Sequence, residues 1–202
     1  DGEKFYTENN NINYNNQLTG CLTFVDSEIK NVILNSNYSL CEDGYNFVRT
    51  KGSIVETNIN NSLSDGLDFD FSNIDIINLN IDNAQNDCVD MSYGTYTIKE
   101  SNVSNCGDKG ISIGEKSNVS IFSSSIKYAN VGIAAKDSSK VFIKNTNISN
   151  TKYCLAAYRK KQEFSGAYVK TDKIKCENSS KAFDIDGHSK LIKNNIIYQS
   201  KK

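Results

Sequence analysis

The chain has 202 residues, 38% of them hydrophobic and 10% aromatic, and a formal net charge of −1 from 23 basic and 24 acidic residues. This length and apolar content allow one folded domain with its own core. Because the charges nearly cancel, no overall field favours nucleic acid or an anionic membrane surface as a partner. No apolar run approaches the roughly 18 residues of a spanning helix, and the chain opens with Asp1. We therefore expect a soluble, processed protein or an excised domain.

Residues 1–20 are nearly all polar, carry three consecutive asparagines at 9–11 and lack the repeat that follows them. A solenoid needs protection at its ends, because its first coil otherwise exposes an unpaired strand. We expect residues 1–20 to form either a cap over the first coil or a linker from a preceding domain.

From residue 21 onward the sequence repeats. A small residue followed by the pattern apolar, variable, apolar recurs at intervals of 23, 22, 22, 22, 22, 22 and 28 residues. The small residues are Cys21, Gly44, Gly66, Cys88, Gly110, Gly132, Cys154 and Ala182. A second apolar series follows them at a nearly constant offset, through Ile59, Ile81, Val103, Ile126, Ile148 and Ile174. Two series in one register define a repeat architecture.

This repeat predicts an all-β fold. Segments such as Leu67–Phe71 and Ile76–Ile81 alternate apolar and polar residues over the length of a strand, and helical spacing is absent. A period of about 22 residues is too short for a strand-helix-strand unit, and the leucine-rich-repeat pattern is missing. We predict a right-handed parallel β-helix over residues 21–202, with about 7–8 coils and a length of roughly 40 Å.

The six cysteines fit this frame. Three occupy the small-residue column, and the other three follow 20, 18 and 22 residues later, just before the next coil begins. The resulting pairs are Cys21 with Cys41, Cys88 with Cys106, and Cys154 with Cys176. We predict three disulfides that join adjacent coils, with buried free thiols as the alternative. Because there is no Cys-x-x-Cys pair, an oxidising compartment explains the cysteines better than zinc, which suggests a secreted, periplasmic or cell-surface protein.

Two departures from the period are informative. The 28-residue interval contains an insertion at about 159–167, which must leave the coil as a loop, and inserted loops on solenoids often carry function. Near the C-terminus, Ile192–Tyr198 is apolar enough to complete a last half-coil. No amphipathic capping helix is visible there, so we expect this end to be covered by something else.

Aspartates on neighbouring coils form a candidate metal site. Asp68 and Asp90 each stand two residues after the small residue of successive coils, so they should lie side by side, and Asp70 follows in the same strand as Asp68. Two carboxylates about 5 Å apart repel by roughly 3 kcal/mol at an effective dielectric near 20, which favours protonation of one or a cation between them. Their oxygen atoms suit Ca²⁺. A solvated acidic face and a catalytic site are the alternatives.

The inserted loop offers a candidate binding site. Arg159, Lys160 and Lys161 lie beside the aromatic residues Tyr158 and Phe164. Cationic groups next to aromatic rings could hold a sugar that carries a carboxylate or a sulfate. The alternative is a solvated loop without a ligand.

Several segments resemble the bacterial right-handed β-helix repeat proteins of the pectate-lyase-like superfamily. They are Ser64–Ser72, Asn86–Asp90, Cys106–Ser117, Gly132–Ser138 and Ala156–Phe164. They look like the β-helix segments that accompany spore-coat-kinase-like (CotH) domains in large bacterial surface proteins. The likeness covers about residues 18 to 190. It implies a β-helix at a bacterial surface, but it does not imply any particular reaction.

Lyases and epimerases of that superfamily place acidic calcium ligands and Arg or Lys bases on one strand face. Asp68, Asp70 and Asp90 match the acidic half of this arrangement, but the two arginines, Arg49 and Arg159, lie several coils apart. The Asp-Pro-His-Glu segment of mannuronan epimerases cannot be present, because the chain has no proline. This departure puts a lyase-like activity in doubt.

Three functions fit the sequence. The one we favour is a non-catalytic extracellular module that binds a polysaccharide or a protein partner. The second is a calcium-dependent polysaccharide lyase or epimerase that uses Asp68, Asp70 and Asp90 with Lys109 as a base. The third is a structural subunit of a surface assembly or filament that stacks through its coil ends. Fold analogy alone cannot choose among them.

Overall fold

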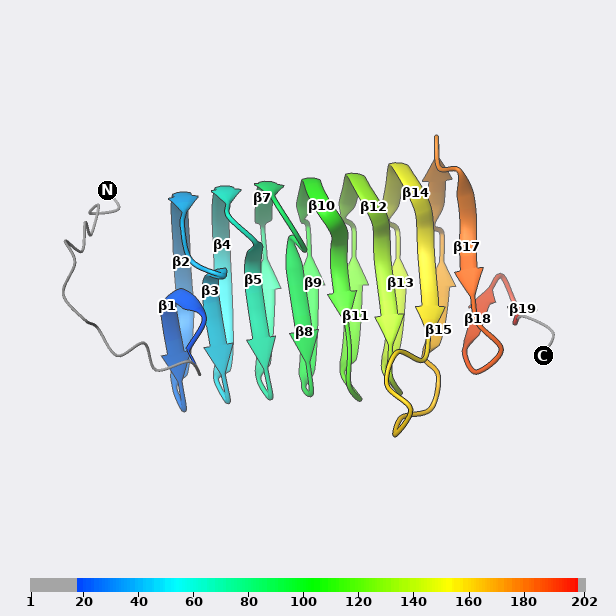
Figure 1. Ribbon diagram of the computed structural model, residues 1–202, viewed down its shortest axis with the longest axis horizontal. Helices are drawn as coiled ribbons and strands as arrows, with labels where there is room; N and C mark the ends of the chain where they lie inside the picture. Colours follow the sequence, from blue (N-terminus) through cyan, green and yellow to red (C-terminus); the bar gives the residue numbers. More distant parts are fainter. Residues whose placement is uncertain (1–17, 200–202) are drawn as a thin grey trace.

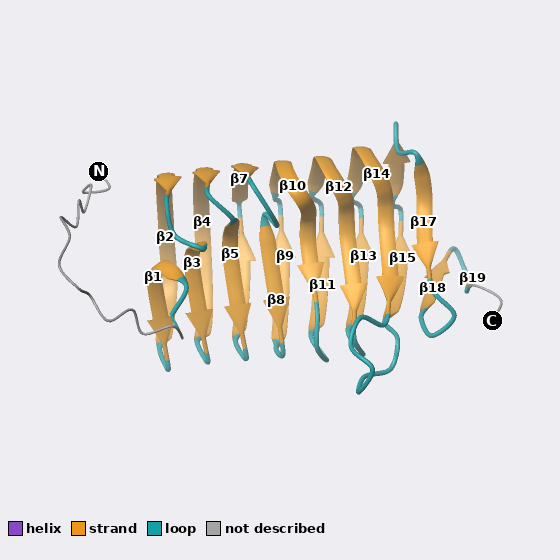
Figure 2. Cartoon of the chain, in the orientation of Figure 1, coloured by secondary structure: helices purple, strands orange, loops and turns teal. Residues whose placement is uncertain are grey.

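In the computed structural model, which describes residues 18–199, the chain forms a rod of stacked β-coils (Figure 1). Strands and loops account for all of this part of the chain, without a helix (Figure 2). The strands are β1 (Gly20–Val25), β2 (Glu28–Ser39), β3 (Asp43–Val48), β4 (Lys51–Ser62), β5 (Asp65–Asp70), β6 (Asn73–Ile77), β7 (Leu79–Ala84), β8 (Val89–Ser92), β9 (Thr95–Lys99), β10 (Asn102–Ile113), β11 (Asn118–Phe122), β12 (Ser125–Lys136), β13 (Lys140–Lys144), β14 (Asn147–Tyr158), β15 (Tyr168–Asp172), β16 (Lys175–Glu177), β17 (Lys181–Ile185), β18 (Lys190–Lys193) and β19 (Ile196–Tyr198).

Parallel pairing arranges these strands as three faces. The front sheet consists of β1, β3, β5, β8, the C-terminal parts of β10, β12 and β14, and then β17. The second sheet runs from the starts of β2 and β4 through β6, β9, β11, β13, β15 and β18. The third sheet contains β7, β16 and the remaining parts of β2, β4, β10, β12 and β14. The predicted parallel β-helix is therefore confirmed, with about 22 residues per coil.

Like residues stack on like residues inside the rod, because each coil repeats the register of the last. The rings of Phe24, Phe47 and Phe69 form a column with centroid separations of 4.8 and 4.9 Å, which matches the strand spacing. The second apolar series is buried at Ile59, Ile81, Val103, Ile126 and Ile148. Burial of these ladders supplies the main stabilisation of the fold.

The small-residue column is explained by a close approach between coils. A Cβ atom at Gly66 would lie 2.6 Å from the carbonyl oxygen of Cys88, and one at Gly110 would lie 2.6 Å from that of Gly132. No real Cβ contact is this short, so these positions need glycine.

Asparagines in the left-handed conformation turn the corner between the third sheet and the front sheet. Asn61, Asn83, Asn105 and Asn150 have φ values between 54° and 66° at this corner. Asparagine tolerates this conformation better than most residues, because its short amide hydrogen-bonds locally. The high asparagine content is thus partly a requirement of the coil geometry.

Three disulfides connect Cys21 with Cys41, Cys88 with Cys106, and Cys154 with Cys176. Their Cα–Cα distances are 5.2, 5.4 and 5.8 Å. These are the pairs expected from the sequence, and the structure has no free cysteine among the described residues.

The prediction that Ile192–Tyr198 completes a last half-coil is wrong. β18 continues the second sheet, but β19 turns back and pairs with β18 in the antiparallel sense. The cause is the pair Asn194 and Asn195, whose φ values of 50° and 62° fit the tight turn of a two-residue hairpin.

The insertion at 159–167 contains no strand and protrudes from the rod between β14 and β15 (Figure 1). The expectation of a cap or linker at residues 1–20 falls almost entirely outside the described residues. No helix that could cross a membrane occurs between residues 18 and 199.

Candidate functional site

The front sheet presents three rows of outward side chains. The first row is Asp43, Asp65, Asp87, Lys109, Val131, Tyr153 and Lys181. The second row is Asn46, Asp68, Asp90, Ser112, Ala134, Ala156 and Asp184. The third row includes Val48, Asp70, Ser92, Lys136 and Tyr158. Carboxylates dominate the early coils, whereas lysines, alanines and tyrosines dominate the later ones.

Asp68 and Asp90 are neighbours on β5 and β8, as predicted. Asn46 Nδ2 donates a 2.6 Å hydrogen bond to Asp68 Oδ2. Burial, followed by the charges of Asp70, Asp43 and Asp90, raises the pKa of Asp68 to about 9. Asp68 is therefore protonated at neutral pH, which is one of the two ways in which the repulsion between adjacent carboxylates can be relieved.

Calcium binding by Asp68, Asp70 and Asp90 stays a prediction. Between residues 18 and 199, the structure has no group of three or more His, Cys, Asp or Glu side chains arranged to hold a metal ion. Because Asp68 also retains its proton, a calcium ion would have to displace that proton and draw the three side chains together.

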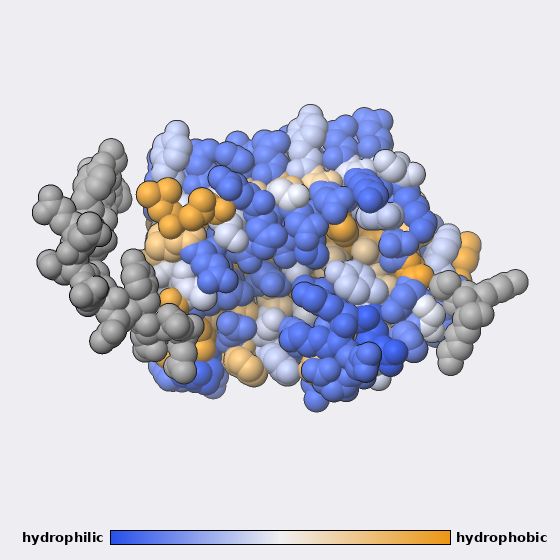
Figure 3. Space-filling model, in the orientation of Figure 1, coloured by the Kyte–Doolittle hydropathy of each residue, from blue (hydrophilic) through white to orange (hydrophobic). Residues whose placement is uncertain are grey.

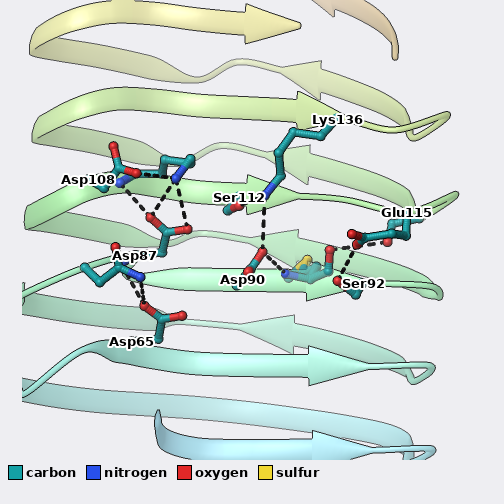
Figure 4. Close-up of polar contacts among 12 residues, drawn as sticks. Asp65, Asp87, Asp90, Ser92, Asp108, Ser112, Glu115 and Lys136 are labelled. Carbon is teal, nitrogen blue, oxygen red and sulfur yellow. Dashed lines mark hydrogen bonds and ion pairs between the residues drawn. The ribbon is translucent and has the colours of Figure 1, made fainter. Parts of the chain in front are cut away.

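Lys109 in the first row contacts two carboxylates, those of Asp87 and Asp108, which lie near each other in Figure 4. Asp65 Oδ1 accepts hydrogen bonds from the backbone N–H of Asp87 and from Asn86 Nδ2, and Asp87 Oδ1 accepts one from the backbone N–H of Lys109. The Lys109 ammonium group contacts Asp87 at 3.3 Å and Asp108. Burial tends to lower the pKa of Lys109, but the hydrogen bond to Asp108 and the charge of Asp87 raise it above its usual value.

Lys136 lies across the centre of the front sheet. Its side chain leaves β12 and is buried, and its Nζ donates a 2.7 Å hydrogen bond to Ser112 Oγ. The same Nζ lies 4.0 Å from Asp90 Oδ1, and Asp90 Oδ1 also accepts a hydrogen bond from the backbone N–H of Met91 (Figure 4). A lysine ammonium group is thus held in a fixed position on an outer face.

The inserted loop is attached to the edge of this surface. Asp137 Oδ1 accepts hydrogen bonds of 2.7 and 2.8 Å from the backbone N–H groups of Lys160 and Lys161. Lys161 Nζ lies 2.5 Å from Glu115 Oε1, and Ser92 Oγ donates to the other oxygen of Glu115 at 2.6 Å. The loop therefore forms a wall beside the third row.

An aromatic ladder continues this wall. Phe71 and Tyr93 stack with ring centroids 4.6 Å apart, and Phe164 of the loop packs edge-on against Tyr93 at 6.3 Å. Phe71 remains 53% exposed. Exposed rings beside fixed polar groups are a common platform for amphipathic ligands.

The predicted binding residues are brought together only in part. Tyr158 is half-buried against Ala134, Ala156 and Val131 on the front sheet. Lys160 is exposed in the loop, whereas the charge of Lys161 is already paired with Glu115. The backbone N–H of Arg159 donates to Asp186 Oδ2 at 2.8 Å, and Phe164 faces Tyr93.

The repeat pattern does not single out Lys136 and Glu115, the residues that organise the surface. Lys136 stands four residues after Gly132, and its register partner Tyr158 stands four residues after Cys154. Comparing the coils at the fourth residue after each small residue, and not only at the second, would have found this pair. Nothing in the spacing signals that Glu115 receives a lysine from the loop.

This surface is open. A cavity of about 230 Å³ lies instead on the third sheet, lined by residues that include Asn58, Asn80 and Asn102. We give the front sheet more weight, because it holds the buried ammonium group, whereas the cavity is lined mainly by asparagines that bond one another between coils. An open face suits a polymer better than a small molecule.

Residues 65–202 match the family described as right handed beta helix region, and the chain belongs to that family. Among solved structures, the A-module of the mannuronan C-5 epimerase AlgE4 of Azotobacter vinelandii is similar, with a TM-score of 0.51 and 12% identity over 84% of this chain. The chain spans 58% of that module's length, and identity this low shows a common fold alone. No curated protein sequence matches the chain.

The three disulfides fit an oxidising environment, in which such bonds form and persist. They agree with an extracellular or secreted protein.

Proposed function

We propose that the chain is an extracellular module that binds a polysaccharide across the front sheet without transforming it. The binding surface comprises Asp90, Ser112, Lys136, Tyr158 and the loop 159–167. A location at a bacterial cell surface, beside other domains of a larger protein, belongs to the same proposal and is supported by the resemblance of its repeat segments.

The buried ammonium group of Lys136 carries this proposal. The residue is 7% exposed although its side chain points away from the core. Holding a charged group out of water costs free energy unless hydrogen bonds replace the lost hydration. Ser112 and Asp90 supply only part of that replacement, so the ammonium group retains donor capacity. Sugar hydroxyl groups are suitable acceptors.

The charge arrangement favours a neutral sugar over a polyanion. Lys109, Lys136 and Lys161 each face a carboxylate already, at Asp87, Asp90 and Glu115. The surface therefore offers many hydrogen-bonding groups but little net positive field. Figure 3 shows that this side of the molecule is mostly hydrophilic.

Calorimetric titration with a neutral oligosaccharide, such as a β-linked glucan, and with an oligomannuronate tests this function. We expect the neutral sugar to bind, and Lys136→Met to weaken binding at least tenfold, about 1.4 kcal/mol. Lys140→Met is the matched control, because Lys140 is exposed on the second sheet. Equal binding by wild type and the Lys136 variant would contradict the proposed site.

A lyase or epimerase is the second candidate, supported by the likeness to the epimerase module. Both reactions need a base that removes a proton from the sugar ring. Lys109 is a poor choice, because its neighbours keep it protonated, and burial raises the pKa of Tyr158. Proton NMR of polymannuronate after incubation with the protein decides the matter: new guluronate or unsaturated signals would favour the enzyme.

A further inference from the structure

The charges of this nearly neutral chain are separated along the rod. Residues 18–108 contain 14 acidic and 4 basic residues, and residues 109–199 contain 7 acidic and 16 basic residues. The two halves therefore carry formal charges of −10 and +9. Because successive coils stack along one axis (Figure 1), this asymmetry reaches both ends of the rod. Residues 20–43 contain four acidic residues and one basic residue, and residues 173–193 contain five basic and three acidic residues.

Both ends expose unpaired strand edges. Within residues 18–199, β1 pairs only with β3, and β2 only with β4. At the other end, β16 and β17 each pair only with β14. Such edges present rows of free N–H and C=O groups that can accept another strand. Only the second sheet is closed at its C-terminal end, where β19 covers β18.

Apolar side chains accompany these edges. Leu22 on β1 is 49% exposed, although its equivalents on the next two coils, Tyr45 and Leu67, are buried. Ile33 on β2 is 57% exposed, at a position where the next coil carries the exposed Glu56. At the other end, Ile196 and Ile197 on β19 are 58% and 55% exposed. Each end is also held together by a disulfide, Cys21–Cys41 and Cys154–Cys176. A disulfide thus braces the coils at each end of the described part of the rod.

We propose that the protein associates head to tail with a second copy of itself, the β16–β17 end of one molecule stacking on the β1–β2 end of the next. This inference is independent of carbohydrate binding. The occupant is a second copy because its opposite end supplies the complementary charge. Its strands in the front and third sheets also run in the direction that parallel pairing with β17 and β16 requires.

Symmetric pairing of like ends would be unfavourable. It would bring two negative or two positive ends together, and like charges in contact across an interface cost several kcal/mol. A head-to-tail contact is heterologous, so it leaves one end of each kind free and can extend into a filament.

Sedimentation velocity of the full chain tests the proposal. We expect concentration-dependent association at low ionic strength that weakens in high salt, because screening shortens the reach of charges to a few ångströms. Variant A, Lys175→Glu with Lys181→Glu, makes the positive end negative. Variant B, Glu28→Lys with Glu42→Lys, makes the negative end positive. All four side chains are exposed. Each variant alone should associate at least tenfold more weakly than wild type.

Mixing the two variants provides the decisive measurement. The mixture should associate again, because every contact between A and B joins ends of opposite charge. The matched controls reverse exposed charges along the sides of the rod, by Lys127→Glu with Lys140→Glu and by Asp75→Lys with Glu100→Lys. Circular dichroism checks that each variant folds.

Three results would overturn the proposal. One is a wild-type protein that stays monomeric at low ionic strength over the whole concentration range. Another is a side-of-rod control that loses association as strongly as variant A or B. The third is a mixture of A and B that associates no better than either variant alone.

Discussion

Asp68 illustrates how a single residue escapes prediction from the sequence. The spacing places Asp68 beside Asp90 and predicts either that one carboxyl group keeps its proton or that a cation lies between them, and the structure confirms that they are neighbours. Which one is protonated depends on burial. Asp68 is packed beside the buried Asn46, and burial is the largest cause of its raised pKa. Burial depth differs between adjacent coils and leaves no mark in the repeat.

This raised pKa predicts the pH dependence of stability. The folded pKa of Asp68, about 9, exceeds its ordinary value of 3.8, so the folded state binds more protons between these limits. Its stabilising contribution is complete below about pH 4 and is lost as pH rises toward 9. Asp68→Asn should therefore stabilise the fold at pH 8, by on the order of 2 kcal/mol, and hardly at pH 4.

Urea unfolding at both pH values measures this effect. Asp75→Asn, which removes an exposed carboxylate on β6, is the control and should change stability little at either pH. A destabilised Asp68→Asn protein at pH 8 would show that the ionised form of Asp68 is the one that supports the fold.

At the scale of elements, the period predicted most of the architecture. Small residues mark the start of each coil because coils approach closely there, and at Gly66 and Gly110 even a Cβ atom would clash with the next coil. The β19 reversal was missed because Ile192–Tyr198 has the right apolar content for a coil, and the two asparagines within it decide the turn. The surface around Lys136 was missed because outward positions vary from coil to coil.

The disulfides give an element-level prediction. Cys88–Cys106 encloses a loop of 18 residues in the middle of the rod, where both cysteines are buried. Closing such a loop restricts the unfolded chain, so Cys88→Ala with Cys106→Ala should lower the free energy of unfolding by about 3 kcal/mol.

Urea unfolding of this variant beside wild type, both oxidised, provides the measurement. Cys21→Ala with Cys41→Ala opens a loop of similar length at the N-terminal end and serves as the comparison. Unchanged stability in the central variant would mean that stacking alone fixes the central coils.

For the whole molecule, a net charge of −1 conceals strong repulsion within each half. In a solenoid each coil contacts only its neighbours, so its stability depends on local charges more than on the total. The N-terminal half, residues 18–108, has 14 acidic but only 4 basic residues, so few of its carboxylates can pair within that half. The C-terminal half has 7 acidic residues among 16 basic ones, so all of its carboxylates can find a partner.

Added salt should therefore stabilise the N-terminal coils more than the C-terminal ones. Screening at 0.1 M salt limits charge interactions to about 10 Å, which weakens repulsion between aspartates on nearby coils and also the attraction between the two halves. The repulsion is the stronger of these two interactions, because neighbouring coils are closer than the centres of the halves. Hydrogen exchange measured by mass spectrometry, at concentrations where sedimentation shows monomers, should slow more in β3, β5 and β8 than in β11 and β13. Faster exchange in β3, β5 and β8 on adding salt would show that attraction between the oppositely charged halves holds the rod together.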